Sequence, residues 1–92
     1  MIRSFTHKGL HKFFTTGSTA GIQAKHKERM AKILLLLDGA TAVQDIALPS
    51  YDLHKLKGNM KNLWAVKVSG NWRVTFRFED GDVYVVNYLD YH

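Results

Sequence analysis

The chain of 92 residues has the length of one small domain, and its 46% hydrophobic content is enough to build a core. It contains no cysteine, which excludes disulfides, thiolate metal sites and cysteine nucleophiles and suits a reducing cytoplasm. The net charge of +5 favours an anionic partner such as nucleic acid, although a solvated basic surface would give the same total. No apolar run approaches the roughly 20 residues of a membrane-spanning helix, so we expect a cytoplasmic protein without a membrane partner.

Two amphipathic helices are predicted in the first half of the chain, after a short edge strand at residues 2–5. The first covers residues 7–16, where apolar side chains recur at intervals of three and four and Gly17 follows as a stop signal. The second covers residues 23–38, and Gly39 stands where a left-handed C-terminal cap belongs.

The predicted helix 23–38 has one apolar face and a charged beginning. Its apolar positions fall on one side and are expected in the core: Met30, Ile33, Leu34 and Leu37. Its early charges are expected to face water: Lys25, Lys27, Glu28 and Arg29. A further short helical turn is predicted at residues 42–48, closed by Pro49 and Ser50.

The second half of the chain predicts an antiparallel sheet. Polar and apolar side chains alternate over residues 63–69 and 72–78, and residues 82–89 supply a closing strand. The Gly70-Asn71 and Asp80-Gly81 pairs between these strands are hairpin-turn signals. Three strands joined by tight turns, with two helices to cover their apolar face, indicate an α+β fold.

The polar face of this predicted sheet is basic. Arg73, Thr75 and Arg77 alternate along one strand and therefore project to the same side, and Lys67 and Ser69 belong to the neighbouring strand. No acidic residue occurs between positions 53 and 78, a window that holds His54 and six cations: Lys55, Lys57, Lys61, Lys67, Arg73 and Arg77. This segregation predicts a cationic, hydroxylated platform with a local positive field that suits a phosphate backbone.

Three short stretches carry a family resemblance: LHKLKG at residues 53–58, NWRVTF at 71–76 and DYH at 90–92. Together with MIRSF at the start, they resemble the HigB toxins of the RelE/ParE superfamily. The resemblance implies a RelE-like α+β domain over residues 1–92, with a short N-terminal strand and two helices packed on one face of a mainly antiparallel sheet. It also implies a type II toxin that cuts mRNA in the ribosomal A site, and a helix-turn-helix, HigA-like antitoxin as partner.

The same resemblance implies roles for individual residues. Catalysis is expected from His54, Asp90, Tyr91 and His92, phosphate binding from Lys57 and Arg73, and an mRNA base contact from Asn71. The charge pattern, and not the resemblance, adds the other basic side chains of the window, which are expected to contact RNA, including ribosomal RNA: Lys55, Lys67 and Arg77.

Cleavage of RNA without a metal or cofactor needs three kinds of group. A base must activate the ribose 2′-OH, an acid must protonate the leaving 5′-oxygen, and cations must stabilise the charge on phosphorus. Imidazoles titrate near neutral pH and suit both proton transfers. We assign His54 as the base and His92 as the acid, with Asp90 orienting one of them, and the reverse assignment of the two histidines stays open.

Two other functions fit the same residues. A toxin of the ParE kind would act on DNA gyrase without cutting RNA, and a plain RNA-binding module would bind without cutting. His7 and His11 have a spacing that can bind zinc on a helix, but no carboxylate or cysteine nearby completes a site, so no metal is predicted.

Overall fold

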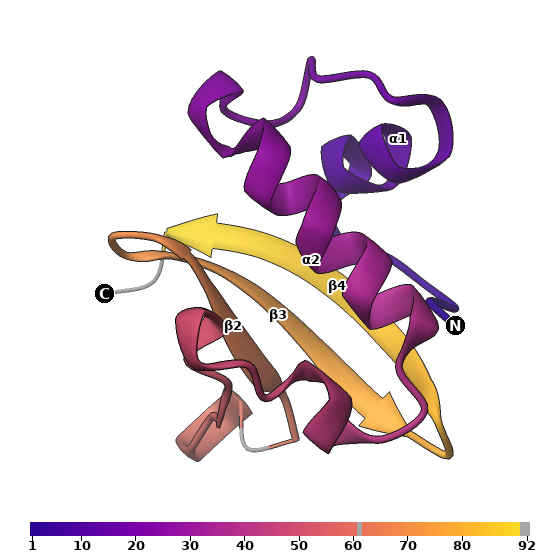
Figure 1. Cartoon of the computed structure of the whole chain (residues 1–92), viewed down its shortest axis with the longest axis vertical. Helices are drawn as coiled ribbons and strands as arrows, with labels where there is room; N and C mark the ends of the chain where they lie inside the picture. The colour runs from indigo at the N-terminus through magenta and orange to yellow at the C-terminus, as the bar shows by residue number, and fades with distance from the viewer. Residues whose placement is uncertain (61, 91–92) are drawn as a thin grey trace.

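The computed structural model describes residues 1–60 and 62–90, and it confirms the α+β architecture. Two helices, α1 (Lys8–Thr16) and α2 (Lys27–Gly39), precede a sheet of four strands (Figure 1). The strands are β1 (His54–Lys55), β2 (Trp64–Ser69), β3 (Trp72–Glu79) and β4 (Asp82–Asp90). Four single 3₁₀ turns complete the described elements: η1 (Ala24–His26), η2 (Val43–Ile46), η3 (Pro49–Tyr51) and η4 (Gly58–Met60).

The strands lie in the order β1-β2-β3-β4, and each pairs with its neighbour in antiparallel fashion. Gly70 and Gly81 take positive φ angles of 56° and 81° in the two turns, which is why glycine is needed there. The expected N-terminal strand is reduced to two isolated parallel bridges, from Ile2 to Val83 and from Phe5 to Val86. The sheet is therefore mainly antiparallel, as predicted.

The helices cover one face of the sheet (Figure 1). Met30, Ile33, Leu34 and Leu37 of α2 are fully buried, as their spacing predicts, and they share one core with the inward residues of β2, β3 and β4. Within the described ranges, 1–60 and 62–90, no helix is long and apolar enough to cross a membrane.

Two predictions about α2 were wrong. Gly39 is the last residue of the helix and not a left-handed cap, because the buried Ala40 leaves α2 in an extended conformation with φ −73° and ψ 137°. The left-handed cap is found instead at Gly17, after α1, with φ 81°. Arg29 is half-buried and bonded to other segments, whereas Lys25, Lys27 and Glu28 are exposed as expected.

Candidate functional site

The face of the sheet away from the helices, here called the outer face, gathers an imidazole and two cations. His54 pairs with Ala65, which pairs with Thr75, and Lys67 pairs with Arg73. Directly paired residues project to the same side of a sheet. Val66 and Val74 point into the core, so the residues that alternate with them point to the outer face. His54, Lys67 and Arg73 therefore surround Ala65 on one surface.

The middle of the outer face is covered and not open to water. Ala65 and Thr75 are 0% and 1% exposed, although both project away from the helices. The prediction of a hydroxylated platform was wrong for Thr75, because this small side chain lies among larger neighbours on its own and adjacent strands. Ala65 and Thr75 form a floor, and His54, Lys67 and Arg73 lie on the same face next to it.

The tautomer of His54 follows from its hydrogen bond. Its Nδ1 atom lies 3.0 Å from the main-chain carbonyl oxygen of Asp52. A carbonyl can only accept, so Nδ1 carries the hydrogen and Nε2 of the neutral ring has a lone pair that can take a proton. Asp52 presents this carbonyl from a left-handed conformation, with φ 47°, at the end of η3.

Arg73 is folded against the turn between β2 and β3. Its Nη1 donates to the carbonyl oxygens of Gly70 at 2.7 Å and Trp72 at 3.0 Å. Its Nε is buried and has no hydrogen-bond partner among the residues that the structure describes. Asn71, in the same turn, is exposed. The turn thus presents a fixed guanidinium next to an amide that faces water.

Arg77 is already engaged by protein groups. Its Nε lies 3.2 Å from a carboxylate oxygen of Glu79, and its guanidinium carbon lies 4.8 Å from the ring centroid of Tyr84. The pairing of β3 with β4 shifts register between Thr75 and Arg77, opposite Val85 with its positive φ of 50°. Arg77 is therefore set apart from Arg73 along β3, and its charge is partly neutralised.

Lys55 and Lys57 do not join this group. Lys55 pairs with Trp64, on the side of β1 opposite to His54, and its Nζ lies 5.6 Å from the Trp64 ring centroid. Lys57 is exposed and follows β1 at the end of the sheet away from the β2–β3 turn. Lys61 lies outside the described residues.

Asp90 is the last residue of β4 and pairs with Trp72. It is exposed, and alternation places it on the face of Tyr88, whereas Leu89 faces the same side as Arg73. β1 and β4 are the two ends of the strand order, so three inter-strand steps of about 4.8 Å separate the strand of His54 from that of Asp90. Tyr91 and His92, the other two predicted catalytic residues, lie outside the described residues.

His26 and Tyr88, which the sequence did not single out, lie against Trp72, the residue that pairs with Asp90. His26 is buried, its Nδ1 lies 2.5 Å from the Tyr88 hydroxyl, and its ring packs edge-on against Trp72. Burial lowers the pKa of His26, and nearby Lys25 acts in the same direction, whereas burial raises the pKa of Tyr88. His26 precedes Met30 by four residues, so the helical spacing could have placed it in the core.

The histidines considered for zinc have other partners. His7 accepts the Leu10 N–H at its Nδ1, 3.0 Å away, and caps α1, while the His11 ring stacks on Phe5 with centroids 5.0 Å apart. Among residues 1–60 and 62–90, no group of three metal-binding side chains comes together.

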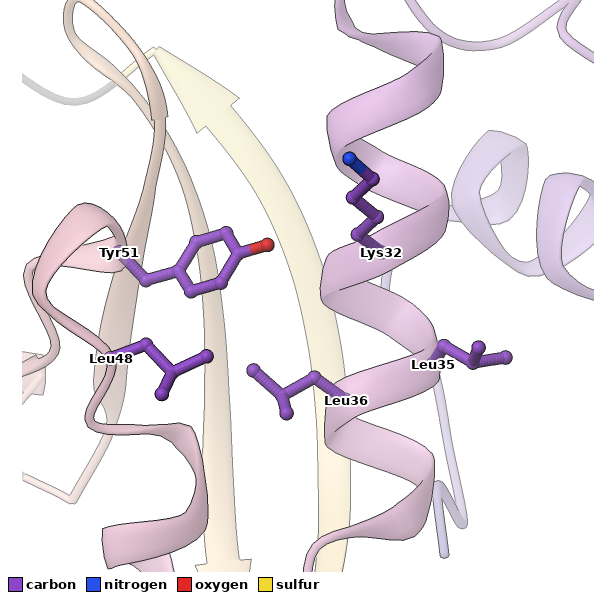
Figure 2. Close-up of a pocket in the computed structure, with 5 residues that line it drawn as sticks. All are labelled: Lys32, Leu35, Leu36, Leu48 and Tyr51. Atoms are coloured by element: carbon purple, nitrogen blue, oxygen red, sulfur yellow. The ribbon is translucent and has the colours of Figure 1, made fainter.

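A hollow on the helix side is mostly apolar (Figure 2). It has a volume of about 420 Å³ and lies between α2 and the segment around η3, lined by Lys32, Leu35, Leu36, Leu48 and Tyr51. None of the predicted catalytic residues lines it, so the outer face is the better candidate for the chemistry.

Comparison with known proteins identifies the family of the chain. The model of a family described as "RelE-like toxin of type II toxin-antitoxin system HigB" matches residues 3–92. A curated relative, endoribonuclease HigB of Proteus vulgaris, is 44% identical over 92 residues and is aligned over 100% of both chains. The chain therefore belongs to the HigB family of RelE-like toxins of type II toxin–antitoxin systems.

Proposed function

We propose that the protein is an endoribonuclease that cuts mRNA in the A site of the ribosome and so inhibits translation. The observation that carries this proposal is the 44% identity, over its whole length, to a relative named as an endoribonuclease. The arrangement of His54, Lys67 and Arg73 around the floor of the outer face supports it, because RNA cleavage needs a proton acceptor next to cations.

The reaction begins at the ribose. The Nε2 of His54, free to accept because Nδ1 donates to Asp52, takes the proton of the 2′-OH. The 2′-oxygen then attacks the adjacent phosphorus, and the bond from phosphorus to the 5′-oxygen breaks. The leaving 5′-oxygen takes a proton from an acid, for which His92 is the candidate, with Asp90 and Tyr91 orienting or assisting. The products are a 2′,3′-cyclic phosphate and a 5′-OH, and the proton balance needs no metal or cofactor.

The cations divide into two groups in this proposal. Arg73 and Lys67 stand on the outer face with His54 and stabilise the charge that develops on phosphorus. Asn71, exposed in the adjacent turn, contacts an mRNA base. The more distant Lys55, Lys57 and Arg77 contact the RNA backbone outside the cleaved linkage, where a point charge is sufficient.

The partners follow from the family. A type II toxin has an antitoxin, and we propose that this one carries a helix-turn-helix domain. The ribosome would supply an mRNA that is unstacked and held in place, which is a large part of catalysis for a site as open as this one. The positive charge of the protein would favour contact with ribosomal RNA in the cytoplasm.

The test compares wild type with His92→Ala on ribosomes programmed with a short mRNA. We expect the wild type to cut in the A site and to leave a cyclic phosphate. We expect the variant to bind ribosomes equally and not to cut. Naked mRNA is the control. A wild type that binds ribosomes without cutting any mRNA would overturn the proposal, and a gyrase supercoiling assay would then be the next experiment.

A further inference from the structure

Arg29, near the start of α2, binds two separate segments of the chain at once. Its Nε and Nη2 donate to the carbonyl oxygen of Lys67 in β2, at 3.1 and 2.9 Å. Nη2 also donates to the carbonyl oxygen of Ser50, and the guanidinium carbon lies 4.5 Å from the ring centroid of Tyr51. One side chain thus connects α2, η3 and β2.

Both segments that Arg29 holds lead directly to the outer face. Ser50 and Tyr51 precede Asp52, whose carbonyl oxygen fixes the His54 imidazole. Lys67 pairs with Arg73, next to the point where the register of β2 and β3 shifts. The hydrogen bonds of Arg29 therefore connect the main chain that leads to His54, the proposed base, with the main chain of Lys67, a proposed phosphate-binding residue.

The contact between α2 and the η3 segment is incomplete elsewhere, which increases the importance of Arg29. Figure 2 shows the hollow between them, with Leu48 and the Tyr51 ring on one side and Leu36 and Lys32 on the other. Leu48 is 47% exposed. Tyr51 is buried in the core, but Leu48 is left partly uncovered at this hollow, so the directional hydrogen bonds of Arg29 add to the apolar packing that orients the segment.

We propose that Arg29 is a positioning residue for the ribonuclease reaction. The proposal depends on the function proposed above. Arg29 does not touch substrate; it holds the turn at 50–52 against β2, so that Nε2 of His54 stays aligned with Lys67 and Arg73. Only a planar guanidinium can bond two carbonyl oxygens and stack on an aromatic ring together, so lysine cannot replace it.

The test uses Arg29→Lys and Arg29→Ala, with Lys27→Ala, an exposed position on the same helix, as the control. Arg29→Lys keeps the charge and the aliphatic stem, so it serves if Arg29→Ala folds poorly. We expect kcat for cleavage on programmed ribosomes to fall about 10- to 100-fold in both variants, because a misplacement on the order of 1 Å is sufficient for such a loss. We expect KM to stay within about twofold, since the RNA-contacting cations are retained.

A second readout does not depend on activity. Long-range proton–nitrogen NMR correlations report which His54 nitrogen carries the hydrogen. We expect a single Nδ1–H tautomer in wild type and in Lys27→Ala, and a mixture in both Arg29 variants. A single Nδ1–H tautomer in a folded Arg29 variant overturns the positioning role, and so does wild-type kcat. A wild type that does not cut RNA refutes the proposed function, and the tautomer still decides whether Arg29 positions His54.

Discussion

The carbonyl oxygen of Asp52 lies 3.0 Å from Nδ1 of His54, and this main-chain contact determines which nitrogen of the ring can accept a proton. The acceptor belongs to the backbone, so the aspartate carboxylate has no part in it. The left-handed conformation of Asp52, with φ 47°, directs the carbonyl to the ring. Asparagine adopts this conformation readily and would preserve the contact.

His54→Ala is expected to lower the rate of cleavage by about 10²- to 10⁴-fold, the usual contribution of a general base. Asp52→Asn is the matched control and should stay within about twofold of wild type, because the carbonyl remains. Single-turnover cleavage on programmed ribosomes measures both, and circular dichroism checks the fold. If Asp52→Asn lost activity while His54→Ala kept full activity, the Asp52 carboxylate would be the base and His54 would not.

Arg73 and Arg77 lie on the same strand and face, yet they should differ in function. Arg73→Ala should lower kcat/KM by about 10²- to 10³-fold, since it removes a guanidinium next to the reacting phosphate. Arg77→Ala should cause a smaller loss, because Glu79 and Tyr84 already hold that side chain. Equal losses in the two variants would show that the ion pair with Glu79 opens when RNA binds.

Alternation predicted the strands and their faces, because a period of two is a direct consequence of strand geometry. It could not predict that Thr75 is buried, since burial on the outer face depends on neighbours from other strands. The helical period correctly placed Met30 and Leu37 in the core. It was wrong for Arg29, because bonds to carbonyls of segments 21 and 38 residues away have no local signal.

The candidate site was predicted as a set of residues and not as an arrangement. Motif resemblance selected His54 and Asp90 without showing that their strands stand at opposite ends of the strand order. The charge pattern grouped Lys55 with Arg73, although Lys55 faces the other side of β1. Pairing register, which depends on turns and bulges in three dimensions, decides which residues of such a set can act together.

The stability of the protein should fall as the pH decreases below about 6.5, the pKa of an unfolded histidine. Burial lowers the pKa of His26 in the folded state, so the folded protein binds a proton less readily than the unfolded chain. The contribution of the neutral ring is complete above that pH and is lost progressively as the pH falls to the lowered pKa.

Replacing His26 with glutamine should reduce this loss, whatever its effect on stability at pH 7. Urea unfolding followed by tryptophan fluorescence at pH 7, 6 and 5 measures the change in the free energy of unfolding. In His26→Gln the free energy of unfolding should still decrease with falling pH, but less steeply than in wild type, because burial lowers the pKa of His7 as well. An identical slope in wild type and His26→Gln would show that His26 is not the group that senses pH.

Gly9 and Gly21 should not tolerate a side chain, because two backbones meet there. A Cβ added to Gly21 would lie 2.4 Å from the Gly9 Cα, and one added to Gly9 would lie 2.7 Å from the Gly21 Cα. Neither backbone atom can move without displacing α1 or the turn before η1, so alanine at either position should lower the free energy of unfolding by about 1–3 kcal/mol.

Gly39→Ala is the control for these two variants. Apart from its own helix and its chain neighbours, no atom of the described residues lies within 4 Å of the position that a Cβ at Gly39 would take, and its φ is not positive. Alanine at this last position of α2 should leave stability unchanged or raise it by up to about 1 kcal/mol. Denaturant unfolding measures the free energy of unfolding of the three variants. If Gly21→Ala were as stable as Gly39→Ala, the close approach of α1 to the segment before α2 would not exist in solution.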